Sequence, residues 1–240
     1  MFKRLCIAAL VVLCVGYAAN LAQRCENGDS EACGGLIPRL MHACDNGDSE
    51  ACKELIPHLQ EACDTNEANG CYNLGISYLN GQGVQQSYKE AAQYFQKACD
   101  MEEAVSCHNL GVLHMKGQGV RVDDKKAMEY FQKACDMEEA VSCHNLGVLY
   151  VEDGARQNYH KAKEYFQKAC DAKLAPACFN LGNSYMLGRG VRQDFTTAKE
   201  YYGKACDSGK QDGCDRYGKA CDLGKQDGCD NYRELRERGF

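Results

Sequence analysis

The chain has 240 residues, with 28 lysine and arginine residues against 34 aspartate and glutamate residues and a formal net charge of −6 at pH 7. This acidic balance argues against nucleic acid or an anionic membrane surface as a partner. There are 18 cysteines and no tryptophan, which is typical of a chain that relies on covalent links as well as on apolar packing.

The first 18 residues have the pattern of a secretory signal peptide. Two basic residues precede the apolar run 5–15, and residues 16–18 supply the small side chains that signal peptidase requires. A lipoprotein cleavage site at Cys14 is the weaker alternative, because the preceding Leu13 is not a small residue. The sequence therefore predicts a cleaved signal, a secreted or periplasmic protein, and no membrane insertion after cleavage.

An internal duplication dominates the rest of the sequence. The 20 residues from Tyr94 to Leu113 recur without a change as Tyr130 to Leu149, 36 residues downstream. Identity over such a length at a fixed interval indicates that the chain is an array of copies of one structural unit. An array is held together by contacts between neighbouring units rather than by one large core.

The cysteines that follow the signal form pairs of uniform spacing. All 16 fall into pairs eight positions apart: Cys25 and Cys33, Cys44 and Cys52, Cys63 and Cys71, Cys99 and Cys107, Cys135 and Cys143, Cys170 and Cys178, Cys206 and Cys214, and Cys221 and Cys229. Structural zinc sites use closer Cys-x2–4-Cys spacings, which are absent here, so zinc is the weaker interpretation. We predict eight disulfides, one in each pair, each stabilising the fold by about 2–3 kcal/mol through the short loop that it closes.

The residues between the cysteine pairs have helical periodicity. Apolar or small side chains at i, i+3, i+4 and i+7 predict a first helix through Cys71, Leu74, Gly75 and Tyr78, and a second one through Ala91, Phe95 and Ala98. The sequence thus predicts two antiparallel helices in each unit.

Glycine-rich segments separate the two helices of most units. Gly-x-Gly-Val occurs at 81–84, 117–120 and 188–191, where glycine permits the positive φ that ends a helix. A phosphate-binding role is the weaker interpretation, because these segments follow a helix and lack a third glycine. Ser87 and Asp123 are predicted to cap the second helix. In the third unit residues 152–155 replace this loop, so its hairpin is the least regular.

These motifs resemble a known repeat family. Cys-x-Asn-Leu-Gly at 71–75, a Gly-x-Gly loop and Ala-x3-Phe-x2-Ala-Cys at 91–99 resemble the Sel1-like repeat, a relative of the tetratricopeptide repeat. With the secretory signal and the disulfides, the chain resembles the Helicobacter cysteine-rich (Hcp) proteins, which are labelled as β-lactamases. The resemblance implies an all-α fold, a right-handed α/α superhelix (solenoid) of helical hairpins with one disulfide per unit. Four units match it, at Ala68–Asp100, Ala104–Asp136, Ala140–Asp171 and Ala175–Asp207.

The domain organisation follows from these matches. We expect a signal peptide at 1–18, shortened N-terminal units at 19–62, four Sel1-like repeats at 63–207, and a shortened unit with a capping helix at 208–240. Each of the two 19-residue N-terminal copies has room for one helix, or for two short ones that meet at Pro38 and Pro57. Both ends are expected to cap the array with polar residues.

The glycine of each Asn-Leu-Gly motif is expected to be structural. A residue without a Cβ allows the second helix of the unit to approach closely through an alanine. The predicted pairs are Gly75 with Ala91, Gly111 with Ala127, Gly147 with Ala162, and Gly182 with Ala198.

The asparagines of these motifs are the candidate binding residues. Each stands one position before a buried leucine, so its side chain should point off the core face, where an amide can bind a peptide main chain in both directions. The four are Asn73, Asn109, Asn145 and Asn180. The alternative is that they bond only to neighbouring backbone. His108 and His144 lie a full repeat apart, too far to share a metal, and are expected to be surface or groove residues.

A hydrolytic site is not evident in the sequence. Serine β-lactamases need Ser-x-x-Lys, and no serine here has a lysine three residues on; Ser87 and Ser208 have one two residues on. Clustered metal-binding histidines are missing, and cysteines in disulfides leave no thiol nucleophile. No catalytic residue, metal or cofactor is therefore predicted, although the resemblance keeps β-lactamase, an antibiotic-resistance hydrolase, as the alternative function.

The sequence favours a monomeric binding scaffold. In related tetratricopeptide arrays the first helices line a concave groove that binds extended peptides. The expected partners are a peptide, a muropeptide or a host protein segment, with penicillin-type β-lactams as further ligands.

Overall fold

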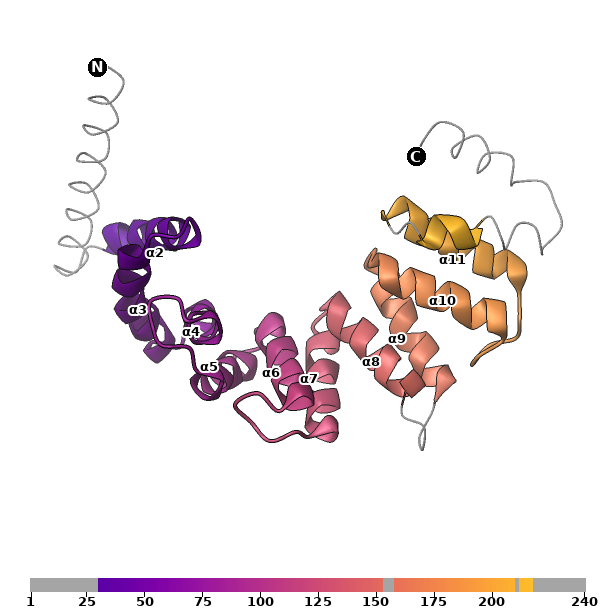
Figure 1. Cartoon of the computed structure of the whole chain (residues 1–240), viewed down its shortest axis with the longest axis horizontal. Coiled ribbons are helices and arrows are strands. Elements are labelled where there is room, and N and C mark those ends of the chain that lie inside the picture. Colours follow the sequence, from indigo (N-terminus) through magenta and orange to yellow (C-terminus); the bar gives the residue numbers. More distant parts are fainter. Residues whose placement is uncertain (1–29, 153–157, 210–211, 218–240) are drawn as a thin grey trace, which may run out of the picture. The chain divides into compact units, whose positions relative to one another are not determined.

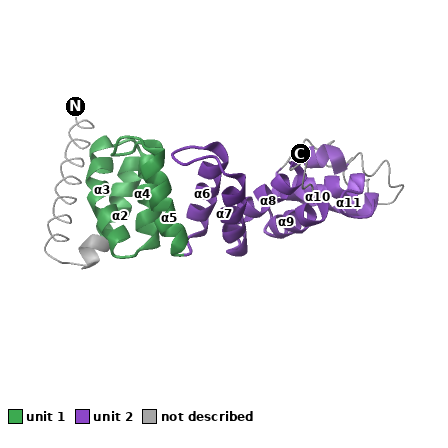
Figure 2. Ribbon diagram, turned by 90° about the horizontal axis from the view of Figure 1, so that it is seen from below, with its two compact units in different colours: residues 1–101 green, residues 102–240 purple. Residues whose placement is uncertain are grey.

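The computed structural model describes residues 30–152, 158–209 and 212–217, and the regular elements within these residues are α-helices (Figure 1). The chain divides into two compact units, residues 1–101 and 102–240 (Figure 2). Within each unit every helix packs against the next one along the chain. The all-helical repeat fold that the sequence predicts is thereby confirmed.

The first unit contains four described helices, α2 (Ser30–Asp45), α3 (Ser49–Asp64), α4 (Ala68–Asn80) and α5 (Tyr88–Asp100). Pro38 lies inside α2 and Pro57 inside α3, so each proline sits within one continuous helix. A proline inside a helix removes one backbone hydrogen bond. In α3, burial of Leu55 and Leu59 offsets that cost, because full burial of a leucine stabilises a fold by about 1.5–3 kcal/mol.

The second unit contains six labelled helices, grouped in three hairpins. They are α6 (Ala104–Lys116) and α7 (Asp124–Asp136), α8 (Ala140–Glu152) and α9 (Tyr159–Asp171), and α10 (Ala175–Leu187) and α11 (Phe195–Asp207). Each first helix pairs with the second helix of its own hairpin, and α7 and α9 also pack against the first helix of the following hairpin. Of the unusual loop predicted at 152–155, Glu152 is the last residue of α8, and residues 153–155 lie outside the described residues.

The helix ends agree with the sequence-based expectation. Gly81, Gly117 and Gly188 follow first helices in the left-handed conformation, with φ of 74°, 68° and 66°. Ser87 and Asp123 accept hydrogen bonds from the backbone N–H groups three residues on, as N-caps do. The bond from the Lys126 N–H group lowers the pKa of the Asp123 carboxyl. These features form from residues close in sequence, so a local pattern suffices to predict them.

The glycine of each Asn-Leu-Gly motif lies under an aromatic ring rather than under the predicted alanine. A Cβ on Gly111 would come within 2.8 Å of two atoms of the Phe131 ring, and within 3.2 Å of the carbonyl oxygen of Ala127. The corresponding ring over Gly147 is Phe166, at 2.5 Å. The prediction of a close helix contact is therefore right, but a buried ring on the second helix makes most of it.

Within each compact unit, disulfides link helices that follow one another along the chain. Bonds between cysteines eight positions apart are present, as predicted, at Cys44–Cys52, Cys63–Cys71, Cys135–Cys143, Cys170–Cys178 and Cys206–Cys214. Cys99 and Cys107 are disulfide-bonded as well. In the second unit the Cys135–Cys143 and Cys170–Cys178 bonds run from the end of a second helix to the next first helix, so each of them links two consecutive repeats.

The two outermost disulfides stay predictions. They are the bond between Cys25 and Cys33 and the bond between Cys221 and Cys229. Cys25, Cys221 and Cys229 lie outside the described residues, and Cys33 is described only by its backbone, at the start of α2. The structure therefore tests neither pair, and chemical mapping of the linkages has to decide them.

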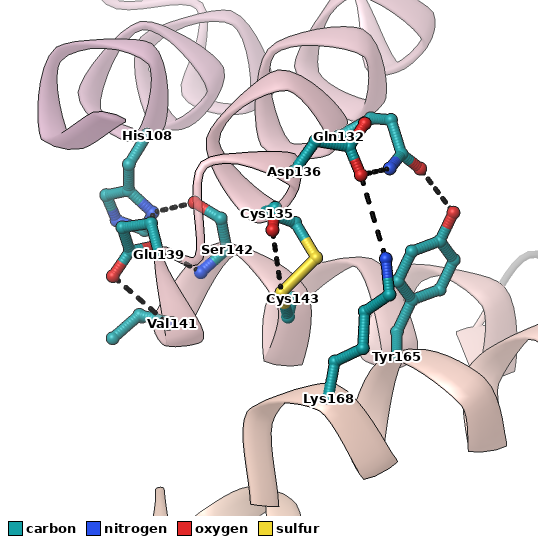
Figure 3. Close-up of a disulfide and its surroundings, with 10 residues drawn as sticks. All are labelled: His108, Gln132, Cys135, Asp136, Glu139, Val141, Ser142, Cys143, Tyr165 and Lys168. Carbon is teal, nitrogen blue, oxygen red and sulfur yellow. Dashed lines mark hydrogen bonds and ion pairs between the residues drawn. A yellow bond between two sulfur atoms is a disulfide. The ribbon is translucent and has the colours of Figure 1, made fainter. Parts of the chain in front are cut away.

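Polar contacts stand on both sides of the Cys135–Cys143 bond (Figure 3). On one side the Tyr165 hydroxyl donates to Gln132, and Lys168 lies 3.7 Å from Asp136. The same arrangement recurs where Tyr201 donates to Gln167 at 2.7 Å. Burial raises the pKa of the Tyr165 and Tyr201 hydroxyls. The exposed ion pair between Lys168 and Asp136 contributes little to stability, so the buried disulfide and the packed rings contribute most of it at this junction.

Candidate functional site

The four candidate asparagines occupy the same place in the first helices α4, α6, α8 and α10. The leucine that follows each of them is buried. The most exposed of the four, Leu110, has 2% of its surface exposed. The asparagines themselves are half-buried, at Asn73, Asn109, Asn145 and Asn180. Asn73 belongs to the first unit and the other three to the second. Each amide therefore stands at the edge of the core with part of its surface open.

The amides of these asparagines differ in their contacts. Asn73 Nδ2 lies 3.9 Å from Met41 Sδ, and Asn180 Nδ2 lies 3.1 Å from His144 Nε2. Within the described part of the chain, no hydrogen bond joins the side chain of Asn109 or Asn145 to another residue. Among the described residues, none of the four amide side chains bonds to the backbone, so their hydrogen-bonding groups do not serve the helices.

A pocket of about 290 Å³ lies beside Asn180, between α8, α9 and α10. Its apolar walls come from Val148, Val151, Phe166 and Leu187, and it is further lined by Glu152, Tyr159, Asn180, Asn183, Ser184 and Arg189. The Arg189 guanidinium lies 5.5 Å from the centre of the Tyr159 ring. An apolar pocket with a few amides is typical of a site that binds a small group and fixes its orientation.

The corresponding pocket beside Asn73 in the first unit is much smaller. Its volume is about 40 Å³, and Met41, Leu55, Leu59 and Ile76 are among its lining residues. Met41 places its sulfur against the Asn73 amide. This pocket has room for about one water molecule, so it cannot take an amino-acid side chain.

The sequence suggested a surface or groove position for His108, and the structure shows that its side chain is largely buried. Its side chain is 17% exposed, and its ring lies 5.5 Å from the ring of Phe131. His108 Nδ1 lies 2.8 Å from Ser142 Oγ and 3.5 Å from Glu139 Oε2 (Figure 3). Burial lowers the pKa of the His108 imidazole, and the charge of Glu139 opposes this shift. The cluster therefore links α6 to the start of α8.

This cluster contains the residue types of a hydrolytic triad but not its geometry. In a triad the serine and the carboxylate bond to opposite nitrogens of the histidine. Here Ser142 and Glu139 both face Nδ1 of His108. Ser142 is also fully buried, so its hydroxyl cannot reach a substrate. The arrangement is that of a packing contact between repeats.

His144 occupies the same position in the next repeat but has different neighbours. Ala177 stands where Ser142 stands one repeat earlier, and Leu174 stands in place of Glu139. The His144 ring lies 5.7 Å from the Phe166 ring, and its Nε2 accepts a hydrogen bond from Asn180 Nδ2. The histidine thus holds one of the candidate binding amides in a fixed orientation.

Two residues of the Asn180 pocket region were missed by sequence reasoning. Asn183 stands where the preceding repeats have Ile76, Val112 and Val148, and it accepts a hydrogen bond of 2.8 Å from the Tyr202 hydroxyl. Tyr202 in turn replaces a phenylalanine of the other repeats. Both departures from the repeat pattern are visible in the sequence, and their joint occurrence in one repeat is the signal that could have revealed the site.

The described residues contain no group of three or more histidine, cysteine or acidic side chains arranged to hold a metal ion. None of the helices among these residues combines the length and the apolar content that a membrane crossing needs. The pocket beside Asn180 is lined by amides, hydroxyls and apolar side chains, together with the charged residues Glu152 and Arg189.

Comparison with known proteins identifies the repeat. The Sel1 repeat model matches residues 68–102, 104–138, 140–174 and 175–210. A search of curated proteins gives no match.

Three solved structures illustrate the similarity. A Sel1 repeat protein from Oxalobacter formigenes aligns with a TM-score of 0.69 and 22% identity, over 86% of this chain and 88% of that one. Helicobacter pylori cysteine rich protein B is 30% identical over 52% of this chain and 91% of its own, with a TM-score of 0.43. A putative sel1 repeat protein from Klebsiella pneumoniae is 21% identical over 85% of this chain and 98% of its own, with a TM-score of 0.47. The first of these supports the fold alone.

Proposed function

The chain belongs to the Sel1 repeat family, and from this premise we propose that it is a secreted scaffold that binds an extended peptide, a muropeptide or a host protein segment. Proteins built from Sel1 repeats generally mediate protein–protein interaction. The proposal assigns ligand binding to the first-helix asparagines Asn73, Asn109, Asn145 and Asn180.

One observation carries the proposal. Asn109 and Asn145 are half-buried amides with no side-chain hydrogen bond to any other described residue. An amide offers two donors and an acceptor, and a half-buried one that is not paired gains most from a ligand that pairs with it. An extended peptide presents alternating N–H and C=O groups, which suits amides placed one repeat apart.

The disulfides bear on where this binding takes place. Several disulfides in one chain indicate an oxidising environment, outside the cell or in a periplasm. Together with the signal predicted at 1–18, which lies outside the described residues, this leads us to propose a secreted or periplasmic protein that meets peptides or peptidoglycan fragments there.

The hydrolase alternative receives less support. The β-lactamase label belongs to the family that the chain resembles, and the one described serine that pairs with a histidine, Ser142, is fully buried. We therefore place penicillins among the ligands rather than among the substrates. A β-lactam contains peptide-like amides, so binding without turnover is consistent with the same asparagines.

Two measurements on the full, disulfide-bonded chain test the proposal. Isothermal titration with muropeptides from a muramidase digest, and separately with benzylpenicillin, should give saturable binding to one site. Nitrocefin should not be hydrolysed faster than in buffer. Turnover that remains after purification to homogeneity, and that is lost with the protein on heat denaturation, would favour the hydrolase instead.

A further inference from the structure

Two amides of α10 have complementary unused groups. Asn180 Nδ2 donates to His144 Nε2, which leaves Asn180 Oδ1 without a partner among the described residues. Asn183 Oδ1 accepts from the Tyr202 hydroxyl, which leaves Asn183 Nδ2 without one in the same part of the chain. The first amide therefore offers an acceptor and the second a donor.

The structure fixes both amides by aromatic partners. Tyr202 is fully buried, and this burial raises the pKa of its hydroxyl. A buried hydroxyl needs an acceptor, so it holds Asn183 in one orientation. His144 is held in turn by its contact with the Phe166 ring. The two unused groups are thus preorganised before any ligand arrives, which reduces the entropy lost on binding.

Both amides line the same pocket. Residues three apart lie on one face of a helix, one turn from each other. The pocket that they share has walls from Val148, Val151 and Phe166 and a volume of about 290 Å³. This volume lies at the lower end of the range for ligand sites, so it suits one aliphatic side chain and its adjoining peptide group rather than a larger molecule.

We propose that this pocket is an anchor site for one aliphatic residue of an extended peptide. The side chain fills the space between α8, α9 and α10, Asn180 Oδ1 accepts from a main-chain N–H group, and Asn183 Nδ2 donates to a main-chain carbonyl. The inference rests on the proposed function, because it names the residue class and the repeat where the peptide is held most specifically.

The other repeats lack this combination. In the second and third repeats the residue that corresponds to Asn183 is Val112 or Val148, and in the first it is Ile76. The pocket beside Asn73, at about 40 Å³, cannot take a side chain. The fourth repeat is therefore where an aliphatic side chain is anchored.

The test uses N-acetyl-leucine methylamide as a probe, titrated into the 15N-labelled full chain. The side-chain NH2 signals of Asn180 and Asn183 should shift and saturate with a dissociation constant of about 1 mM, the value expected for a ligand of this size. N-acetyl-glycine methylamide lacks the side chain and N-acetyl-leucine methyl ester lacks the second N–H group, so both should bind several-fold more weakly.

A double variant separates the anchor from the fold. Asn183→Val with Tyr202→Phe installs the residues of the third repeat, so no buried hydroxyl loses its acceptor and the melting temperature should stay close to wild type. Probe binding should weaken about 3- to 10-fold, as expected for one lost hydrogen bond. The control Val105→Ala alters an exposed valine on α6 and should leave probe binding unchanged.

The outcomes distinguish this inference from the proposed function. Probe binding that weakens by this amount in the double variant supports the anchor even if muropeptides do not bind. Equal probe binding by the double variant and the wild type would overturn the anchor, and so would the absence of shifts at Asn180 and Asn183. If muropeptides still bound in that case, the proposed function would stand without the anchor.

Discussion

His108 and His144 lie in two segments of identical sequence, yet they make different contacts. His108 lies against Ser142 and Glu139, whereas His144 binds the amide of Asn180. The difference arises one repeat downstream, where Ala177 and Leu174 replace the serine and the glutamate. In this array, therefore, the surroundings of a residue are determined jointly by its own repeat and by the next one.

The largest effect should come from the covalent link beside His108. Cys135→Ala with Cys143→Ala removes a bond that is shared by α7 and α8 (Figure 3). In the chain-entropy model, loss of so short a loop lowers the free energy of unfolding by about 2.5 kcal/mol. Urea unfolding at neutral pH measures this difference.

Mapping of the disulfides provides the companion result. A non-reduced digest of the wild type should give eight linkages, each between cysteines eight positions apart, including Cys25 with Cys33 and Cys221 with Cys229. A linkage between cysteines of two different pairs, such as Cys99 with Cys143, would show that the connectivity we infer is wrong.

The contact between Gly111 and the Phe131 ring beneath His108 is the next target. Gly111→Ala places a methyl group against the buried Phe131 ring, on which His108 rests. We expect the free energy of unfolding to fall by about 1–3 kcal/mol, although alanine is the better helix former. As a matched control, a Cβ added to Gly35 in α2 would meet no atom within 4 Å, so Gly35→Ala should be neutral or stabilising. A Gly111→Ala variant as stable as wild type would argue against the close contact.

Ser142, the serine partner of His108, can be replaced by alanine, the residue that the following repeat has at Ala177. Ser142→Ala should cost about 1 kcal/mol, because the imidazole loses its bond to the hydroxyl. Ser106 is its counterpart in the preceding repeat, and its buried Oγ has no hydrogen-bond partner among the described residues. Ser106→Ala should therefore be neutral or slightly stabilising. Thermal unfolding measures the stability of both variants. Equal losses of stability in Ser142→Ala and Ser106→Ala would refute this contrast.

The pH dependence of stability should depend on His108. Its folded-state pKa is lowered by burial, so the unfolded chain binds the extra proton more readily. The free energy of unfolding should therefore be fully retained above the unfolded pKa of about 6.5 and fall as the pH drops below it. The charge of Glu139, just before α8, opposes the lowering of this pKa. The other neighbours, Ser142 and the Phe131 ring, are uncharged and add no electrostatic contribution.

A variant isolates this contribution. His108→Phe installs the residue type that the fourth repeat has at Phe179 and removes the titrating group. Its stability should change less than that of the wild type between pH values of about 7.5 and about 5.5, as followed by urea unfolding at each pH. An unchanged slope would assign the pH dependence to other groups.

The features that sequence reasoning predicted well are local. Each of them involves residues within about ten positions of one another. They are the helix caps at Ser87 and Asp123, the turns at Gly81 and Gly117, and the bonds between cysteines eight apart. The interval between cysteines suffices because the end of one helix and the start of the next are brought together by a short turn.

The features that it missed involve residues about one repeat apart. The partners of His108 and His144 lie 34 and 36 residues downstream, and which atoms meet depends on packing between hairpins. The pocket beside Asn180 depends likewise on α8 and α9 as well as on α10. The periodic pattern identifies equivalent positions but not the contacts in which they differ.

The central claim is that the asparagines serve a ligand rather than the fold. The double variant Asn109→Ala with Asn145→Ala changes the two amides that have no side-chain hydrogen bond among the described residues. Each ligand contact contributes about 0.5–1.5 kcal/mol, so muropeptide affinity measured by titration should fall about tenfold or more. The melting temperature should stay within about 2 °C of wild type. A lowered melting temperature with unchanged affinity would contradict the account and remove these residues from the binding site.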